Sequence, residues 1–79
     1  MLAVIKFYTD EYSKHTDQFA TYDAIANIAS ALTEEGFIYR TDYWIISSSY
    51  NSDGRQILAF EFKDERRAML LKLKGIENE

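Results

Sequence analysis

The pattern of hydrophobic and polar positions along the chain predicts three β-strands. Residues 2–9 alternate between two faces, and residues 55–63 do the same. Residues 37–50 are rich in aromatic and β-branched side chains, which favour strands, so we expect one long strand there. Residues 51–54, with the sequence NSDG, tolerate a positive φ and predict a turn that joins the second and third strands into a hairpin.

Two further segments have apolar residues at helical spacing. We expect the first helix to have Thr21 as its N-cap and to end at Gly36. Its apolar stripe consists of Ile25, Ile28, Ala29 and Leu32. The second helix is expected to follow the N-cap Asp64 and to end at Gly75.

The order of elements is therefore βαββα, in one domain that covers residues 1–79. A right-handed crossover makes the first two strands parallel, and the hairpin makes the third strand antiparallel to both. If the third strand lies between them, the chain is an α+β fold with a three-stranded antiparallel sheet of order 1-3-2 and two helices on one face. This is a ferredoxin-like arrangement that lacks its last strand. The apolar run 57–62 suits a central strand, and a simple 1-2-3 meander is the alternative.

Composition and charge exclude several classes of protein. The chain has no cysteine, which excludes a disulfide scaffold, a thiolate zinc site and a cysteine nucleophile. Thirteen acidic and nine basic residues give a net charge of −4, which argues against a general nucleic-acid binder. The N-terminal sequence lacks the features of a signal peptide, and no apolar run approaches the roughly 18 residues that span a bilayer. We therefore expect a cytoplasmic protein that does not enter a membrane.

No group of residues predicts catalysis or metal binding. His15 lies in the polar, aperiodic segment 10–20, where a solvated loop histidine is expected. Ser47, Ser48 and Ser49 have neither a Gly-x-Ser-x-Gly motif nor a histidine to activate a hydroxyl. The carboxylates are scattered over helix ends and loops. We expect the solvated face of the second helix to carry Lys63, Arg66, Arg67, Lys72 and Lys74. The chain is therefore expected to be no enzyme and to use no cofactor.

The predicted strand 37–50 carries large side chains on both of its faces, although two helices can cover only one face of the sheet. We expect the uncovered face to present a Tyr-rich, partly apolar surface. Tyr, Trp and Arg are enriched at the hot spots of protein interfaces. The candidate partner-binding residues are Tyr39, Arg40, Tyr43, Trp44 and Tyr50. The alternative is that these aromatic residues reflect only a high β propensity, and the sequence leaves open which face of the strand is core.

The first strand lies at an edge of a 1-3-2 sheet, where a fourth strand would otherwise pair with it. Its sequence LAVIKFY is apolar with a single charge, so the edge is poorly protected against pairing. Candidates for edge-strand pairing are Val4, Lys6 and Tyr8. Pairing across a two-fold axis would give a homodimer, and pairing with another protein would be β-augmentation.

The C-terminal part of the chain combines a predicted hairpin with a helix that begins at an acidic pair. From residue 43 an aromatic strand, a turn and an apolar strand lead into DERRAMLLKLK at positions 64–74. This segment resembles the C-terminal ends of small uncharacterised proteins of tailed bacteriophages, which finish with an acidic pair and an Ala-Met-x-x-Lys-Leu helix. The resemblance implies an accessory protein that acts in the host cytoplasm by binding and inhibiting or redirecting a host or defence protein. It implies no functional residue.

The leading hypothesis is therefore a non-enzymatic protein–protein interaction module from a phage or mobile element. The alternative is a module that binds RNA or single-stranded nucleic acid by stacking bases on the sheet aromatics. The negative charge of the chain argues against this alternative. A small hydrolase or nuclease would need carboxylates that converge on one pocket, and the sequence does not predict such a cluster.

Overall fold

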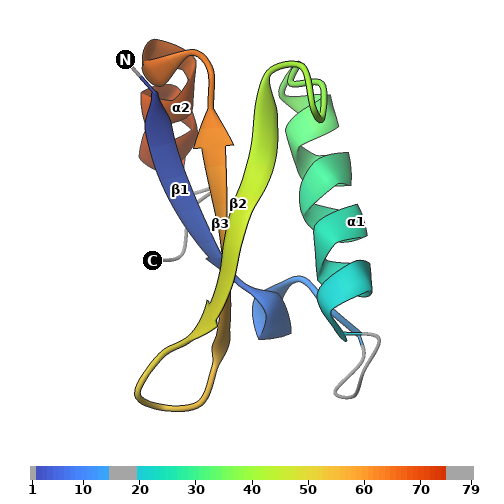
Figure 1. Ribbon diagram of the computed structural model, residues 1–79. Helices are drawn as coiled ribbons and strands as arrows, with labels where there is room; N and C mark the ends of the chain where they lie inside the picture. Colours follow the sequence, from blue (N-terminus) through green and yellow to red (C-terminus); the bar gives the residue numbers. More distant parts are fainter. Residues whose placement is uncertain (1, 15–19, 75–79) are drawn as a thin grey trace.

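Figure 1 shows the computed structural model of the chain, which describes residues 2–14 and 20–74. Its elements are β1 (Ala3–Tyr8), the 3-10 helix η1 (Thr9–Glu11), α1 (Ala20–Glu34), β2 (Tyr43–Tyr50), β3 (Gln56–Phe62) and α2 (Glu65–Leu73). The βαββα order is confirmed, with one short 3-10 turn after β1. His15 and Gly75 lie outside the described residues.

The strands form one antiparallel sheet in the order β1-β3-β2. This order confirms the predicted 1-3-2 sheet and excludes the 1-2-3 meander. The central strand β3 has neighbours on both sides, and its side chains are accordingly the most buried of the three strands. The run from Ile57 to Phe62, which is apolar except for Glu61, is therefore the sequence signal that identified the central strand.

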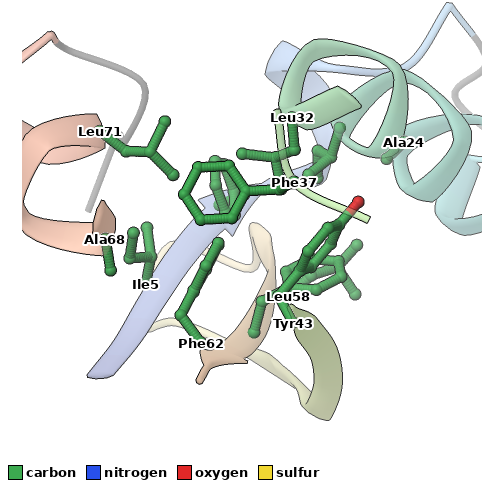
Figure 2. Packing of buried hydrophobic residues seen from close by; sticks show 12 residues of the cluster. Ile5, Ala24, Leu32, Phe37, Tyr43, Leu58, Phe62, Ala68 and Leu71 are labelled. Atoms are coloured by element: carbon green, nitrogen blue, oxygen red, sulfur yellow. The ribbon is translucent and has the colours of Figure 1, made fainter. Parts of the chain in front are cut away.

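Both helices pack on one face of the sheet and enclose a core that is rich in aromatic rings (Figure 2). The strands contribute Ile5, Phe7, Leu58, Phe60 and Phe62 to this core. The helices contribute Ala24, Ile28, Leu32, Ala68 and Leu71. Phe37 fills the space between the helices and the sheet, and its ring meets that of Phe62 edge to face, with 5.4 Å between the centroids. Such edge-to-face pairs add stability beyond the burial of apolar area.

Different side-chain contacts are made at the first turns of the two helices. Helix α1 begins at Ala20, so Thr21 lies inside the helix and is not the N-cap that we expected. The Thr21 hydroxyl instead donates to Gln56 Oε1 at 2.8 Å and joins the helix to the hairpin. Asp64 is the N-cap of α2, as expected, because its carboxylate accepts two N–H groups of the first turn. The end of α1 is also as expected, since Gly36 has a φ of +89° that residues with a Cβ rarely adopt.

Strand β2 begins only at Tyr43, so the long strand expected over residues 37–50 is wrong in its first part. Residues 38–42 form a tight turn. The Asp42 carboxylate accepts the Ile38 N–H at 2.8 Å, and the Ile38 carbonyl accepts the Asp42 N–H at 2.8 Å. Arg40 in this turn has a φ of +70°. The local hydrogen bonds of the Asp42 carboxylate compete with an extended backbone, and here they prevail over the β propensity of the neighbouring residues.

A β-bulge at Ile46 changes which residues of β2 share a face. Side chains alternate along a strand, so one extra residue moves all the following side chains to the opposite face. Ser47 and Ser49 therefore lie on the same face as Trp44, and Tyr50 lies on the helix side. A regular strand, as expected from the sequence, would instead have placed Trp44 and Tyr50 on one face and Ser47 and Ser49 on the other.

The hairpin between β2 and β3 is as expected. Asn51 Oδ1 accepts the N–H groups of Asp53 at 2.9 Å and Arg55 at 3.0 Å, and the Asn51 carbonyl accepts the Gly54 N–H at 3.0 Å. Gly54 has a φ of +81°, which glycine adopts without strain. The turn therefore fixes the register of the two strands through one asparagine side chain and one glycine.

Candidate functional site

Tyr43, which we expected on a partner-binding surface, is fully buried in the core. Its ring stacks on that of Phe62, with 5.2 Å between the centroids and 15° between the planes. Burial raises the pKa of the Tyr43 hydroxyl to about 12, and the nearby Tyr39 adds to the effect. Because a fully buried side chain cannot contact a partner, Tyr43 is a core residue and not an interface residue.

The other candidate residues of this segment lie at three separate places. Trp44 is half-buried on the sheet, where its Nε1–H donates to Glu61 Oε1 at 2.9 Å. Tyr39 and Arg40 lie in the turn before β2, with the Arg40 Cζ 5.8 Å from the centroid of the Tyr39 ring. Tyr50 lies at the hairpin end of β2 and is 70% exposed. The structure therefore does not bring these residues together into one surface.

The sheet face that points away from the helices is called the open face below. The register places on it Val4, Lys6, Tyr8, Ile57, Ala59, Glu61, Trp44, Ser47 and Ser49. Tyr8 is the one tyrosine among these residues, so the Tyr-rich face that we expected is not present. Ile57 and Ala59 in the middle are buried beneath their neighbours. The open face is therefore a mixed surface of apolar, polar and charged side chains.

A cluster of charges closes one end of the open face. The guanidinium carbon of Arg55 lies 3.8 Å from the centroid of the Tyr8 ring. Arg55 Nη2 donates to Asp10 Oδ1 at 2.8 Å and to Glu11 Oε1 at 3.0 Å. The hydrogen bond from Arg55 lowers the pKa of Asp10, and the two carboxylates raise the pKa of Arg55. Because the two carboxylates share the guanidinium group of one arginine, the cluster joins η1 to the residue that precedes β3.

Strand β1 lies at an edge of the sheet, and among the described strands it pairs with β3 alone. The Lys63 N–H donates to the Asp42 carbonyl at 2.9 Å, and the Arg55 carbonyl accepts the Asn51 N–H at 2.9 Å. The odd-numbered residues of β3 therefore turn their backbone groups toward β2, and the even-numbered ones toward β1. On β1, the residues opposite these even-numbered positions are Ala3, Ile5 and Phe7. The backbone N–H and C=O groups of Val4, Lys6 and Tyr8 consequently point away from β3.

The opposite edge of the sheet, at β2, is better protected. The bulge at Ile46 interrupts the regular spacing of backbone groups along this edge. At the start of the strand the Arg40 N–H donates to the Tyr43 carbonyl at 2.7 Å, so the preceding turn covers that end. A second strand can therefore pair along β1 more readily than along β2.

Helix α2 exposes an apolar surface that the sequence analysis missed. Met69, Leu70 and Leu73 are 54%, 57% and 82% exposed, and they lie opposite the buried Ala68 and Leu71. Their i, i+1, i+4 spacing is that of one helical stripe. This spacing could have indicated the surface, because Ala68 and Leu71 alone already provide the side that packs on the sheet. Met69, Leu70 and Leu73 are called the α2 outer surface below.

Arg67 was expected on the solvated face of α2, but it is half-buried and joins the helix to the turn before β2. Its Nη2 donates to the Gly36 carbonyl at 2.7 Å, its Nη1 lies 3.8 Å from Asp42 Oδ1, and its Cζ lies 4.2 Å from the centroid of the Phe37 ring. A depression beside it is lined by Asp42, Lys63, Asp64, Glu65, Arg66 and Arg67. The first N–H groups of α2 are already used by the Asp64 cap, so we assign no ligand to this depression.

Within the described ranges, no group of histidine and carboxylate side chains is arranged to hold a metal ion. Neither α1 nor α2 is long and apolar enough to cross a membrane. Comparisons with protein-family models, curated proteins and solved structures find no match to this chain. The candidate surfaces are thus the α2 outer surface and the outer edge of β1.

Proposed function

We propose that this protein is a non-enzymatic protein–protein interaction module that binds another protein through the α2 outer surface. The observation that carries the proposal is that α2 is apolar on two opposite sides, of which the sheet covers one. A helix of a monomeric globular protein normally presents a polar side to water. Burial of large apolar side chains gives a partner about 25 cal/mol for each Å² removed from water.

The resemblance of residues 43–74 to phage accessory proteins supports a host or defence protein as the partner. The α2 outer surface lies inside the segment that carries this resemblance. In this proposal the module acts by occupying a surface of the partner and so inhibits or redirects it. No catalytic group is needed for such an effect.

The nucleic-acid alternative has less support from the geometry. The two large aromatic side chains of the open face are engaged within the chain, Trp44 with Glu61 and Tyr8 with Arg55. Base stacking needs an exposed ring, and Glu61 places a carboxylate beside the Trp44 ring. A salt-dependent gel shift with single-stranded RNA would revive this alternative.

Affinity capture from a bacterial lysate tests the proposal. We expect the wild-type chain to recover a partner in stoichiometric amount and the double variant L70K/L73K to lose it. Tyr22 of α1 is 75% exposed on another side of the molecule, so Tyr22→Lys is a matched control that should retain the partner. Substitutions at such exposed positions change the free energy of unfolding by about 0.5 kcal/mol or less, so all three proteins should fold. A wild-type chain that recovers no stoichiometric partner, or a double variant that binds as well as wild type, would contradict the proposal.

A further inference from the structure

A cation lies at the N-terminal end of the α2 outer surface. One helical stripe, with i, i+3, i+4, i+7 spacing, contains Arg66, Met69, Leu70 and Leu73. This stripe is on the side of α2 opposite the side chains that pack on the sheet. The Arg66 side chain is exposed, and together with Glu65, Met69 and Leu70 it lines a depression. Any partner that covers the apolar side chains of the stripe therefore also meets the Arg66 guanidinium.

Two cations of α2, Arg66 and Lys72, have no ion pair within the described residues, whereas Arg67 and Lys74 each have a carboxylate partner. Side chains interact along a helix at i±3 and i±4, and neither Arg66 nor Lys72 has an acidic residue at these positions. The neighbouring Glu65 lies in the first turn, where the helix dipole favours an acid, and residues i and i+1 do not face each other. The charges of Arg66 and Lys72 are therefore not compensated within α2.

Basic charge is concentrated at this end of the chain. Five of the nine basic residues but only two of the thirteen acidic residues lie at positions 63–74. This segment therefore has a net charge of +3, which leaves −7 for the rest of the chain. The α2 outer surface is thus the apolar part of a basic region on an otherwise acidic protein. A surface of this kind attracts an acidic partner and repels a basic one.

The position of Arg66 also sets a requirement on the partner. A protein that covers Leu70 and Leu73 removes the adjacent guanidinium from water, and a cation that loses its water without gaining a partner opposes binding. A carboxylate opposite Arg66 removes this penalty, because the planar guanidinium can bind both carboxylate oxygens. Arginine is for this reason among the residues enriched at the hot spots of interfaces.

We propose that the protein bound at the α2 outer surface presents an apolar patch with a carboxylate opposite Arg66 and further acidic residues beside Lys72. This inference rests on the proposed function and adds the charge of the partner to it. Leu70 and Leu73 supply the apolar contact. Arg66 supplies the selectivity, because a partner without the carboxylate would leave the guanidinium unpaired.

An anionic membrane is another surface to which a basic, apolar helix can bind. A membrane is broad, so it would face the acidic residues around this region as well as Arg66 and Lys72. The chain outside positions 63–74 has a net charge of −7, which an anionic surface repels. A protein can instead place its carboxylates opposite the two cations alone, and it therefore fits the charges of this surface better.

Three helical peptides test the charge of the partner. They share one leucine stripe and carry glutamate, glutamine or lysine at the positions beside it. Binding to the isotope-labelled full chain is measured by NMR titration at low salt, from the backbone amide shifts of Met69, Leu70 and Leu73. We expect the acidic peptide to bind about tenfold more tightly than the neutral one, and the basic peptide to bind most weakly. This preference should decrease at high salt, because salt screens exposed charges.

Three variants of the chain sharpen the test. R66E/K72E reverses both charges and should reverse the order, so that the basic peptide binds best. K6E/K14E is the matched control, because it changes the net charge equally at exposed positions outside α2 and should still prefer the acidic peptide. L70K/L73K should lose all three peptides. If a circular dichroism melt shows that R66E/K72E does not fold, Arg66→Gln serves instead and should remove most of the preference for the acidic peptide.

The proposal is overturned if the three peptides bind the wild-type chain equally, if the basic peptide binds best, or if no peptide binds. Equal binding that L70K/L73K abolishes would keep the apolar surface of the proposed function and reject the acidic partner. Binding of phosphatidylserine vesicles but of no peptide would identify a lipid surface as the occupant and overturn both proposals. A solution mass of twice 9.2 kDa that L70K/L73K halves would identify a second copy as the occupant and overturn this inference as well.

Discussion

Removal of the Tyr43 hydroxyl should stabilise this protein. Tyr43 is fully buried, and its hydroxyl has no hydrogen-bond partner among the described residues. Figure 2 shows the oxygen pointing away from the strands, at the side of the core where Leu32 and Ala24 lie. A buried hydroxyl without a partner costs about 1–3 kcal/mol, because folding removes its hydrogen bonds to water and replaces none of them.

The substitution Tyr43→Phe keeps the ring and its packing. Besides stacking on Phe62, the ring lies 5.8 Å from that of Phe60 and 6.4 Å from that of Phe37, measured between centroids. None of these contacts uses the hydroxyl. We therefore expect the free energy of unfolding to rise by about 1 kcal/mol, which corresponds to an increase in Tm of about 4–8 °C for a domain of this size.

Urea denaturation followed by circular dichroism, together with a thermal melt, measures this change. Tyr22→Phe is the matched control, since Tyr22 is 75% exposed and its hydroxyl stays in water in the folded chain. The control should move the urea midpoint very little. If Tyr43→Phe instead lowers the free energy of unfolding by about 1 kcal/mol or more, the hydroxyl has a partner in solution and the reasoning is refuted.

Three further predictions concern the pKa of Tyr43, the contacts of Arg67 and the N-cap Asp64. Burial raises the pKa of Tyr43 from 10.0 to about 12, so the unfolded chain loses this proton at lower pH than the folded chain. The free energy of unfolding should therefore fall as the pH rises from about 10 to about 12. Urea titrations at these pH values should show a smaller fall for Tyr43→Phe than for the wild type. Arg67→Ala removes the guanidinium that joins α2 to the Gly36 carbonyl and covers Phe37, so it should lower the free energy of unfolding by about 1–2 kcal/mol. Arg67→Lys should restore only part of this free energy, because an ammonium group neither stacks on the Phe37 ring nor reaches the Gly36 carbonyl and the Asp42 carboxylate together. Asp64→Ala removes the N-cap of α2 and should cost about 1 kcal/mol in thermal or urea unfolding, whereas Asp64→Asn, which keeps a cap acceptor, should cost less.

The parts of the fold that the sequence predicted are those set by local chemistry or by a long apolar run. The N-cap at Asp64 and the positive φ at Gly54 each favour a few residue types at one backbone position, so the cap and the turn were predictable. The run from Ile57 to Phe62 is apolar except for Glu61, and the strand with a neighbour on each side is the one whose side chains are most buried. The 1-3-2 order therefore followed from the sequence.

The candidate site was predicted less well, because it depends on long-range packing. The α2 outer surface was missed because the apolar positions of this helix do not show by themselves which of them face the sheet, and only the packed structure shows that Ala68 and Leu71 suffice. The late start of β2, at Tyr43, was missed for a different reason. Asp42 closes a turn on Ile38, and this hydrogen bond competes with a strand that the flanking aromatic residues favour equally well.

The bulge at Ile46 explains why the open face is not the aromatic surface that the sequence indicated. In a regular strand Tyr50 would share a face with Trp44, and the open face would carry two large exposed rings. The extra residue moves Tyr50 to the helix side and brings Ser47 and Ser49 to the open face instead. The bulge thus reduces the apolar area of the open face and at the same time breaks the regular edge of β2. The large exposed apolar side chains of α2 consequently outweigh those of the open face, and this is why the proposed interface lies on α2.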